Sequence, residues 1–401
     1  MKYITLFETS TAYNVATLDL PNVSLTVDNN TVHYNSYVEP PHDYSQDYFT
    51  MVVTSGGDIT WTGSTTANPL YYSKNNGENW TIANSSTTIS VVEGDKVLWK
   101  GTPTPREYYG IGKFSGDTNV RYSVEGNAMS LLFGNDFKGQ ISLSGKDFAL
   151  LDLFHGNTNV TSAENLLLPA TTLAFHCYTS MFSNCTNLTA APELPATTLA
   201  YACYNQMFSK CTSLTAAPEL PATTLTESCY RGMFSNCTSL TTAPELPATT
   251  LVTTCYDSMF INCTSLTTAP SVLPATTLAE SCYGSMFSNC TNLTAAPELP
   301  ATTLEYNCYA NMFEGCTSLT AAPELPATTL AESCYSDMFA SCTSLSSIKC
   351  LATDISAYKC IYNWVNGVAA SGTFTKAASM SSWTEGTSGI PSGWTVQTYT
   401  P

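Results

Sequence analysis

The sequence predicts a mixed, β-dominated chain in which an N-terminal β-sandwich-like module precedes a tandem-repeat solenoid and a β-rich C-terminal cap. The repeat is the main observation, because self-similarity at a period of 20 to 50 residues is typical of solenoids. Before the repeats, apolar and polar residues alternate as they do in strands, and after them the chain is rich in Ser, Thr, Gly and Trp. The string LPATTL begins at seven positions, spaced 26 residues apart except for one unit of 27: Leu168, Leu194, Leu220, Leu246, Leu273, Leu299 and Leu325.

Each repeat unit is too small to bury its own apolar side chains. One unit reads LPATTLAESCYSDMFASCTSL from Leu325 to Leu345. The segment around Leu345 and its equivalents is short, Thr-rich and stopped by Pro in most copies, which favours a brief strand. Neighbouring units must therefore stack and share one continuous core. Spacing of three to four residues predicts a short helix or 3₁₀ turn with one buried face at Cys334, Tyr335, Met338, Phe339 and Cys342.

Composition changes along the chain predict five segments. Asn76-Gly77 is a hairpin signal within the strand-like region, and Pro-rich stretches bracket that region. A degenerate repeat copy begins at Phe154, with Asn157 at the place of a Cys, and predicts a capping unit. The segments are an N-terminal segment with at least one hairpin (1–43), a β-sandwich-like domain (44–105), the N-terminal cap of the solenoid (106–167), the seven repeats (168–349) and the C-terminal cap (350–401).

The charge balance restricts the classes of partner. The chain has 31 acidic and 14 basic residues, a formal net charge of −17 and a sequence pI near 4.4. Such a surface repels phosphate backbones and anionic lipid, so we expect no nucleic-acid partner. No apolar run approaches the roughly 18 residues of a membrane span, and we expect no membrane insertion. The first residues also lack the apolar run of a cleaved secretion leader.

The sixteen cysteines follow the repeat and do not form an obvious disulfide framework. Fourteen occur two per unit, as in Cys177 and Cys185. Partners eight residues apart across a helical turn would exceed the roughly 7 Å limit between their Cα atoms. Bridges between equivalent cysteines of adjacent units remain an alternative, but buried free thiols are the simpler interpretation. Zinc is disfavoured, since no CxxC pair and no recurring His accompany these residues.

The sequence carries no recognisable catalytic pattern. None of the four histidines belongs to a nucleophile motif, and G-x-S-x-G, phosphate-loop and H-E-x-x-H patterns are absent. We therefore expect no enzyme, no cofactor and no bound metal, and a catalytic carboxylate pair is the alternative. A row of equivalent glutamates favours a solvated acidic stripe over a calcium site. This acidic row comprises Glu193, Glu219, Glu245, Glu298 and Glu324.

One variable column of the repeat predicts a binding surface. Among the three residues before the first Cys of each unit, the middle position changes from copy to copy, whereas the neighbouring Tyr, Met and Phe positions are constant. Constant positions build the core, and variable ones must face solvent. Exposed aromatic rings there could stack on sugars or on a protein epitope, with drift at tolerant positions as the alternative. This outer column consists of Phe175, Tyr201, Glu227, Thr253, Glu280, Tyr306 and Glu332.

The repeats resemble the Treponema/Bacteroides surface-protein class of leucine-rich repeats. The likeness rests on the order F-x-x-C-x-x-L, as in Phe182-Cys185-Leu188, and covers about half of the chain. Ala and Thr stand where that class usually has Ile or Val, so this chain is a variant. The resemblance implies a right-handed, horseshoe-like solenoid used for adhesion. The whole chain is similar to multidomain proteins of Bacteroides and their phages, in which the N-terminal segment anchors to the particle.

These expectations combine into a non-enzymatic phage virion appendage or adhesin. Its N-terminal region would contact other virion proteins, and its repeats would bind a host surface protein or glycan. The expected location is the exposed exterior of the virion, which the lack of a leader favours over the alternative of a bacterial cell surface. A structural decoration or assembly protein of the virion is the second reading. Fibrous phage attachments are often trimers, so a homotrimer is one expectation for the assembly.

Overall fold

The computed structural model describes residues 23–28, 31–36, 42–63 and 68–400. The chain divides into two compact units, Met1–Asp43 and Tyr44–Pro401. In the first unit, strands β1 (Val23–Asp28) and β2 (Thr31–Ser36) pair antiparallel, with Val27 opposite Val32. The hairpin expected in the N-terminal segment is therefore present.

The second unit begins with two sheets. One is six-stranded with the order β11-β10-β3-β8-β5-β6, and the other is three-stranded with the order β7-β4-β9. The short helices η1 (Tyr44–Gln46), α1 (Ser130–Phe133) and η2 (Gly134–Asp136) lie between strands in the sequence. The strands are β3 (Phe49–Ser55), β4 (Gly57–Gly63), β5 (Leu70–Ser73), β6 (Thr81–Ala83), β7 (Thr87–Val91), β8 (Lys96–Gly101), β9 (Gly112–Gly116), β10 (Arg121–Asn127) and β11 (Val160–Leu167).

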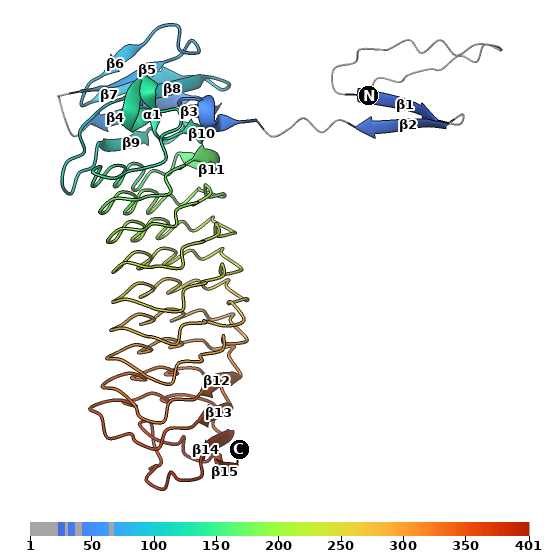
Figure 1. The fold of residues 1–401 in the computed structure, drawn as a ribbon, viewed down its shortest axis with the longest axis vertical. Coiled ribbons are helices and arrows are strands. Elements are labelled where there is room, and N and C mark those ends of the chain that lie inside the picture. Colours follow the sequence, from blue (N-terminus) through green and yellow to red (C-terminus); the bar gives the residue numbers. More distant parts are fainter. Residues whose placement is uncertain (1–22, 29–30, 37–41, 64–67, 401) are drawn as a thin grey trace. The chain divides into compact units, whose positions relative to one another are not determined.

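Aromatic rings from both sheets meet in one core. Phe114 of β9 lies 4.7 Å from Trp61 of β4 and 4.8 Å from Trp99 of β8, measured between ring centroids. All three side chains are buried. The predicted boundary at residue 105 falls within this arrangement, because β10 pairs with β3 on one side and with β11 on the other. Strand β11 runs parallel to β10 and leads directly into the repeats (Figure 1).

The repeats form a solenoid of successive coils (Figure 1). On one face, alternate backbone amides have different acceptors. Met207 N–H donates to Tyr204 O within its own coil, at 3.1 Å. Tyr204 N–H and Phe208 N–H instead donate to Cys229 O and Met233 O of the next coil, at 3.0 and 2.9 Å. Each coil is thus a chain of turns that is bonded to its neighbour at every second residue, and we call this face the turn ladder.

The prediction of a short helix or 3₁₀ turn in each repeat is wrong. Every fourth residue of the turn ladder has a positive φ, as at Ser333, Asp337 and Ser341 in the last repeat, and a right-handed helix cannot contain such residues. Asn and Gly adopt this conformation most readily, which explains their frequency before the second Cys. With φ between 59° and 71°, the residues at that position are Asn184, Lys210, Asn236, Asn262, Asn289, Gly315 and Ser341.

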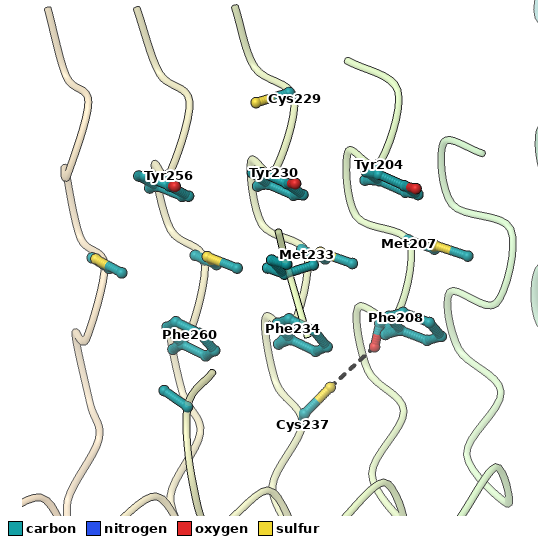
Figure 2. Close-up of a cluster of buried hydrophobic side chains, with 14 of the residues drawn as sticks. Tyr204, Met207, Phe208, Cys229, Tyr230, Met233, Phe234, Cys237, Tyr256 and Phe260 are labelled. Atoms are coloured by element: carbon teal, nitrogen blue, oxygen red, sulfur yellow. Dashed lines mark hydrogen bonds between the residues drawn. The ribbon is translucent and has the colours of Figure 1, made fainter. Parts of the chain in front are cut away.

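The constant side chains form parallel columns inside the solenoid. Figure 2 shows equivalent rings in rows that cross successive coils. Tyr204 stacks on Tyr230 at 5.7 Å and Phe208 on Phe234 at 5.6 Å between ring centroids. The paired ring planes differ by 3° and 7°, and all four side chains are buried. Stacked pairs of this kind stabilise a fold by about 0.5–1.5 kcal/mol beyond area burial. The stacks therefore reinforce the register of adjacent coils.

All sixteen cysteines are free and buried, which confirms the interpretation as buried thiols. The second cysteine of each unit also donates a hydrogen bond to the preceding coil. Cys237 Sγ lies 3.1 Å from Phe208 O, drawn as a dashed line in Figure 2, and Cys263 Sγ lies 3.1 Å from Phe234 O. These thiols therefore act as weak cross-coil donors as well as small apolar fillers.

Atypical coils close both ends of the stack. At the start, Phe154 stacks on Phe182 with an angle of 3° between the rings. Asn157 occupies the place of a Cys, and its Nδ2 donates to Tyr122 Oη and Phe114 O at 2.7 and 2.9 Å. At the other end, Trp364 stacks on Tyr335 and is covered by Trp383. At each end, a coil with an atypical aromatic or amide side chain therefore takes the place of a further repeat.

The opposite face of the solenoid becomes a regular sheet only at its end. Strands β12 (Ala321–Leu325), β13 (Ser347–Cys350), β14 (Thr373–Ala377) and β15 (Thr395–Tyr399) pair in parallel in that order. In the earlier repeats the equivalent APELP segments show only isolated bridges, such as Thr242 with Thr268. Two prolines per segment lack an N–H and interrupt the ladder. The strand predicted in each unit is regular only at this end, where β13, β14 and β15 lack proline and β12, which still contains Pro323, pairs with β13.

Lys210 lies at a position that favours Asn, which allows a stability prediction. Lys210→Asn should stabilise the protein by about 1 kcal/mol, since Asn tolerates a φ of 61° better than Lys does. The urea midpoint or Tm measures this change. The reciprocal variant Asn184→Lys should destabilise by a similar amount. Equal midpoints for both variants and the wild type would contradict this account of the turn ladder.

Alkaline pH should destabilise the protein. Burial raises the pKa of Cys263 to about 12, whereas an unfolded Cys has a pKa of about 8.5. Because the folded state retains the proton more tightly, this stability is complete below pH ~8.5 and is lost as pH rises toward ~12. Tm should fall steadily across that window when measured under reducing conditions. Native protein should also resist a thiol reagent until urea is added, and rapid native labelling would refute the burial.

Candidate binding surface

The structure places the predicted outer column at the solvent-facing edge of the turn ladder. Six of its seven residues are exposed, and the seventh, Thr253, is half-buried. Phe175 and Tyr201 are each 39% exposed and Tyr306 is 45% exposed. The Cys and Tyr positions that follow two and three residues later in each unit are buried. The variable positions of the repeat therefore lie at the surface, and the constant Cys and Tyr positions lie in the core.

Backbone hydrogen bonds hold the outer column in register. His176 N–H donates to Tyr201 O, and Ala202 N–H donates to Glu227 O, both at 3.1 Å. The same type of bond links Asn307 N–H to Glu332 O at 3.1 Å. Consecutive residues of the column thus lie one coil apart. Their spacing is set by the backbone and does not depend on the side chain at each position. The two end coils continue the column with Asp147 and Tyr358, which also lie in exposed positions.

Aromatic side chains cluster at the first coils of this edge. Phe175 stacks on Tyr201 at 5.1 Å with 12° between the planes, and Phe148 stacks on His176 at 5.6 Å with 4°. Tyr108, which is 72% exposed, lies 5.9 Å from Phe148. Partial burial lowers the pKa of His176, which favours the neutral imidazole near pH 7. The cluster is an exposed apolar surface of the kind that marks binding sites.

The APELP face contains two adjoining hollows. The first has a volume of about 500 Å³ and lies between the segments that contain Pro192 and Pro218. The second has a volume of about 580 Å³ and lies between those that contain Pro218 and Pro244. Both are open and lined mainly by Thr, Ala, Pro and Glu. The interrupted backbone ladder therefore leaves a shallow groove beside part of the acidic row.

The solenoid surface is acidic and mostly uncompensated. Residues 168–349 contain 12 acidic and 3 basic residues, a formal charge of 3 − 12 = −9. Two of the carboxylates form ion pairs: Asp257 with Arg231 at 2.9 Å, and Glu324 with Lys349 at 2.8 Å. The other ten have no ion-pair partner within the described part of the chain. All five glutamates of the acidic row are exposed. This exposure agrees with the interpretation of the row as a solvated acidic stripe.

Across residues 42–63 and 68–400, no group of three or more His, Cys, Asp or Glu side chains is placed to hold a metal ion. The described helices include none long and apolar enough to cross a membrane. No family model, no curated protein and no solved structure matches this chain. The proposals below therefore depend on the surface and on the sequence pattern.

Three features of the surface were not predicted from the sequence. Tyr358 extends the outer column, but it follows an irregular segment that hides its alignment with the repeats. Lys349 pairs with Glu324 across one coil, but the 26-residue period places Cys350 opposite that glutamate, so only the coil-to-coil register reveals the pair. The hollows have no sequence signature beyond the recurring prolines, which remove amide donors from the ladder.

Calcium should not stabilise the protein. The acidic row supplies one carboxylate per coil, whereas calcium needs six to eight oxygen ligands around one point. Adding millimolar calcium or a chelator should leave Tm unchanged in a thermal unfolding assay. Glu219→Gln provides the control, because any calcium effect through the row should disappear in that variant. A calcium-dependent rise in Tm that Glu219→Gln removes would restore the metal hypothesis.

Proposed function

We propose that this protein is a non-enzymatic adhesin of the leucine-rich-repeat class, displayed on the exterior of a virion or, alternatively, of a bacterial cell. Its N-terminal region, including a β-sandwich-like module, attaches the chain to other proteins of the particle. The outer column of the solenoid binds a host surface protein or glycan. Support for the repeat class comes from the F-x-x-C-x-x-L order and the stacked coils that it produces.

One observation carries the binding proposal. Six of the seven side chains of the outer column are exposed and the column is varied, although the backbone and interior beneath it repeat almost unchanged. Large aromatic side chains at such positions expose apolar surface to water without contributing to the buried core. A binding role accounts for their presence at Phe175, Tyr201 and Tyr306. Rigid coils also suit recognition, because the partner does not have to order the surface on binding.

Cell binding tests this function directly. Fluorescently labelled full-length protein should bind cells of a susceptible bacterium, with a Bacteroides panel as the first set, and a glycan array should identify sugar ligands. The double variant Phe175→Ser/Tyr201→Ser should bind at least about tenfold more weakly, since exposed aromatic anchors dominate such interfaces. Val92→Ser removes exposed apolar surface from the N-terminal module and should leave binding unchanged.

Two outcomes would contradict the proposal. Absence of binding to any cell or glycan, together with ordered contacts between copies in an imaged particle, would identify a decoration or assembly protein instead. Equal binding by the double variant and the wild type would move the site away from the outer column. The Tm of each variant should be measured as well, because the lost Phe175–Tyr201 stack is expected to cost about 1 kcal/mol.

A further inference from the structure

We propose that the part of the outer column formed by Glu280, Tyr306 and Glu332 docks a cationic protein segment. One lysine or arginine of the partner would lie against the Tyr306 ring and pair with a carboxylate of an adjacent coil. This inference rests on the proposed function and specifies the chemistry of the partner. A neutral glycan and an acidic segment are the competing occupants.

The backbone places the three side chains on consecutive coils. Ser281 N–H donates to Tyr306 O at 3.0 Å, and Asn307 N–H donates to Glu332 O at 3.1 Å. Equivalent rings in this part of the solenoid are 5.8 to 6.1 Å apart from one coil to the next. Tyr306 therefore stands one coil step from a carboxylate on each side. Both glutamates are exposed and lack an ion-pair partner among the described residues.

The protein uses the same combination of groups for a lysine of its own. Lys349 Nζ lies 2.8 Å from Glu324 Oε2 and 3.8 Å from the centre of the Tyr399 ring. Glu324, Lys349 and Tyr399 come from strands β12, β13 and β15 of the terminal sheet. A carboxylate and a tyrosine held on nearby coils can thus receive an ammonium group between them. At Tyr306 the outer column offers this pair of groups, and no lysine or arginine of the described residues lies over the ring.

Charge complementarity favours a cation over the other occupants. The repeats carry a formal charge of −9, from 3 basic and 12 acidic residues. An acidic segment would be repelled by this field, and a cationic one would be steered toward it. A neutral glycan could stack on Tyr306 but would leave the flanking carboxylates without their strongest type of partner. Cation–π contact and ion pairing also act together, since both attract the same ammonium or guanidinium group.

Fluorescence anisotropy with defined peptides tests the proposal on the full-length protein. The probe is a labelled, flexible Gly/Ser peptide with a lysine at every fourth position. Two controls carry acetyl-lysine, which removes the charge and keeps the stem, or glutamate at the same positions. The lysine peptide should bind at least about tenfold more tightly than either control, and added salt should weaken it. A neutral oligosaccharide serves as the third competitor.

Matched variants locate the site. Glu332→Gln and Tyr306→Leu should each weaken binding of the lysine peptide by about three- to tenfold. Glu298→Gln makes the same charge change at an exposed glutamate of the acidic row and should alter binding less than about twofold. Equal effects of Glu298→Gln and Glu332→Gln would overturn the proposal, since a diffuse field would then explain the binding. Equal binding of the lysine and acetyl-lysine peptides would overturn it too.

The same variants separate this inference from the proposed function. Cell binding that survives without lysine-peptide binding, and that Tyr306→Leu abolishes, would keep the adhesin role and replace the cationic partner by a glycan. Lysine-peptide binding without any cell binding would keep the site and reject the adhesin role.

Discussion

The structure depends on the hydrogen bonds that join each coil to the next through alternate backbone amides. One backbone amide in two donates within its own coil, and the other donates to the following coil. Every turn is therefore held both by a hydrogen bond inside the coil and by a hydrogen bond to its neighbour. This pattern does not involve side chains, so it repeats even where the sequence changes. The stacked Tyr and Phe columns then add specific packing to a register that the backbone has already set.

The same bonds explain why the positive-φ positions matter. A chain of turns can present an amide to its neighbour at every second residue only if it reverses direction at regular intervals, and a left-handed residue at every fourth position achieves this. Asn and Gly lower the cost of those reversals, and the ladder tolerates Lys210 at some expense. Stability in this solenoid is therefore distributed between local turn chemistry and contacts between neighbouring coils.

The sequence predicted the surface of the solenoid better than its backbone. The 26-residue period was sufficient to predict stacking, and the constant positions identified buried residues such as Tyr230 and Phe234. The turn ladder was mistaken for a helix because a left-handed residue at every fourth position produces the same three- to four-residue spacing of apolar residues. Asn before the second Cys was the available signal. The pairing of Lys349 with Glu324 could not be predicted, because it requires the coil-to-coil register.

The outer column contributes little to the packing beneath it, and this has an evolutionary consequence. A new side chain at Glu227 or Tyr306 changes what the surface presents without disturbing the interior columns. Recombination between nearly identical repeats would add or remove whole coils and so lengthen or shorten the proposed binding surface in unit steps. A lineage could thus alter both the chemistry and the length of this surface while retaining one set of internal contacts.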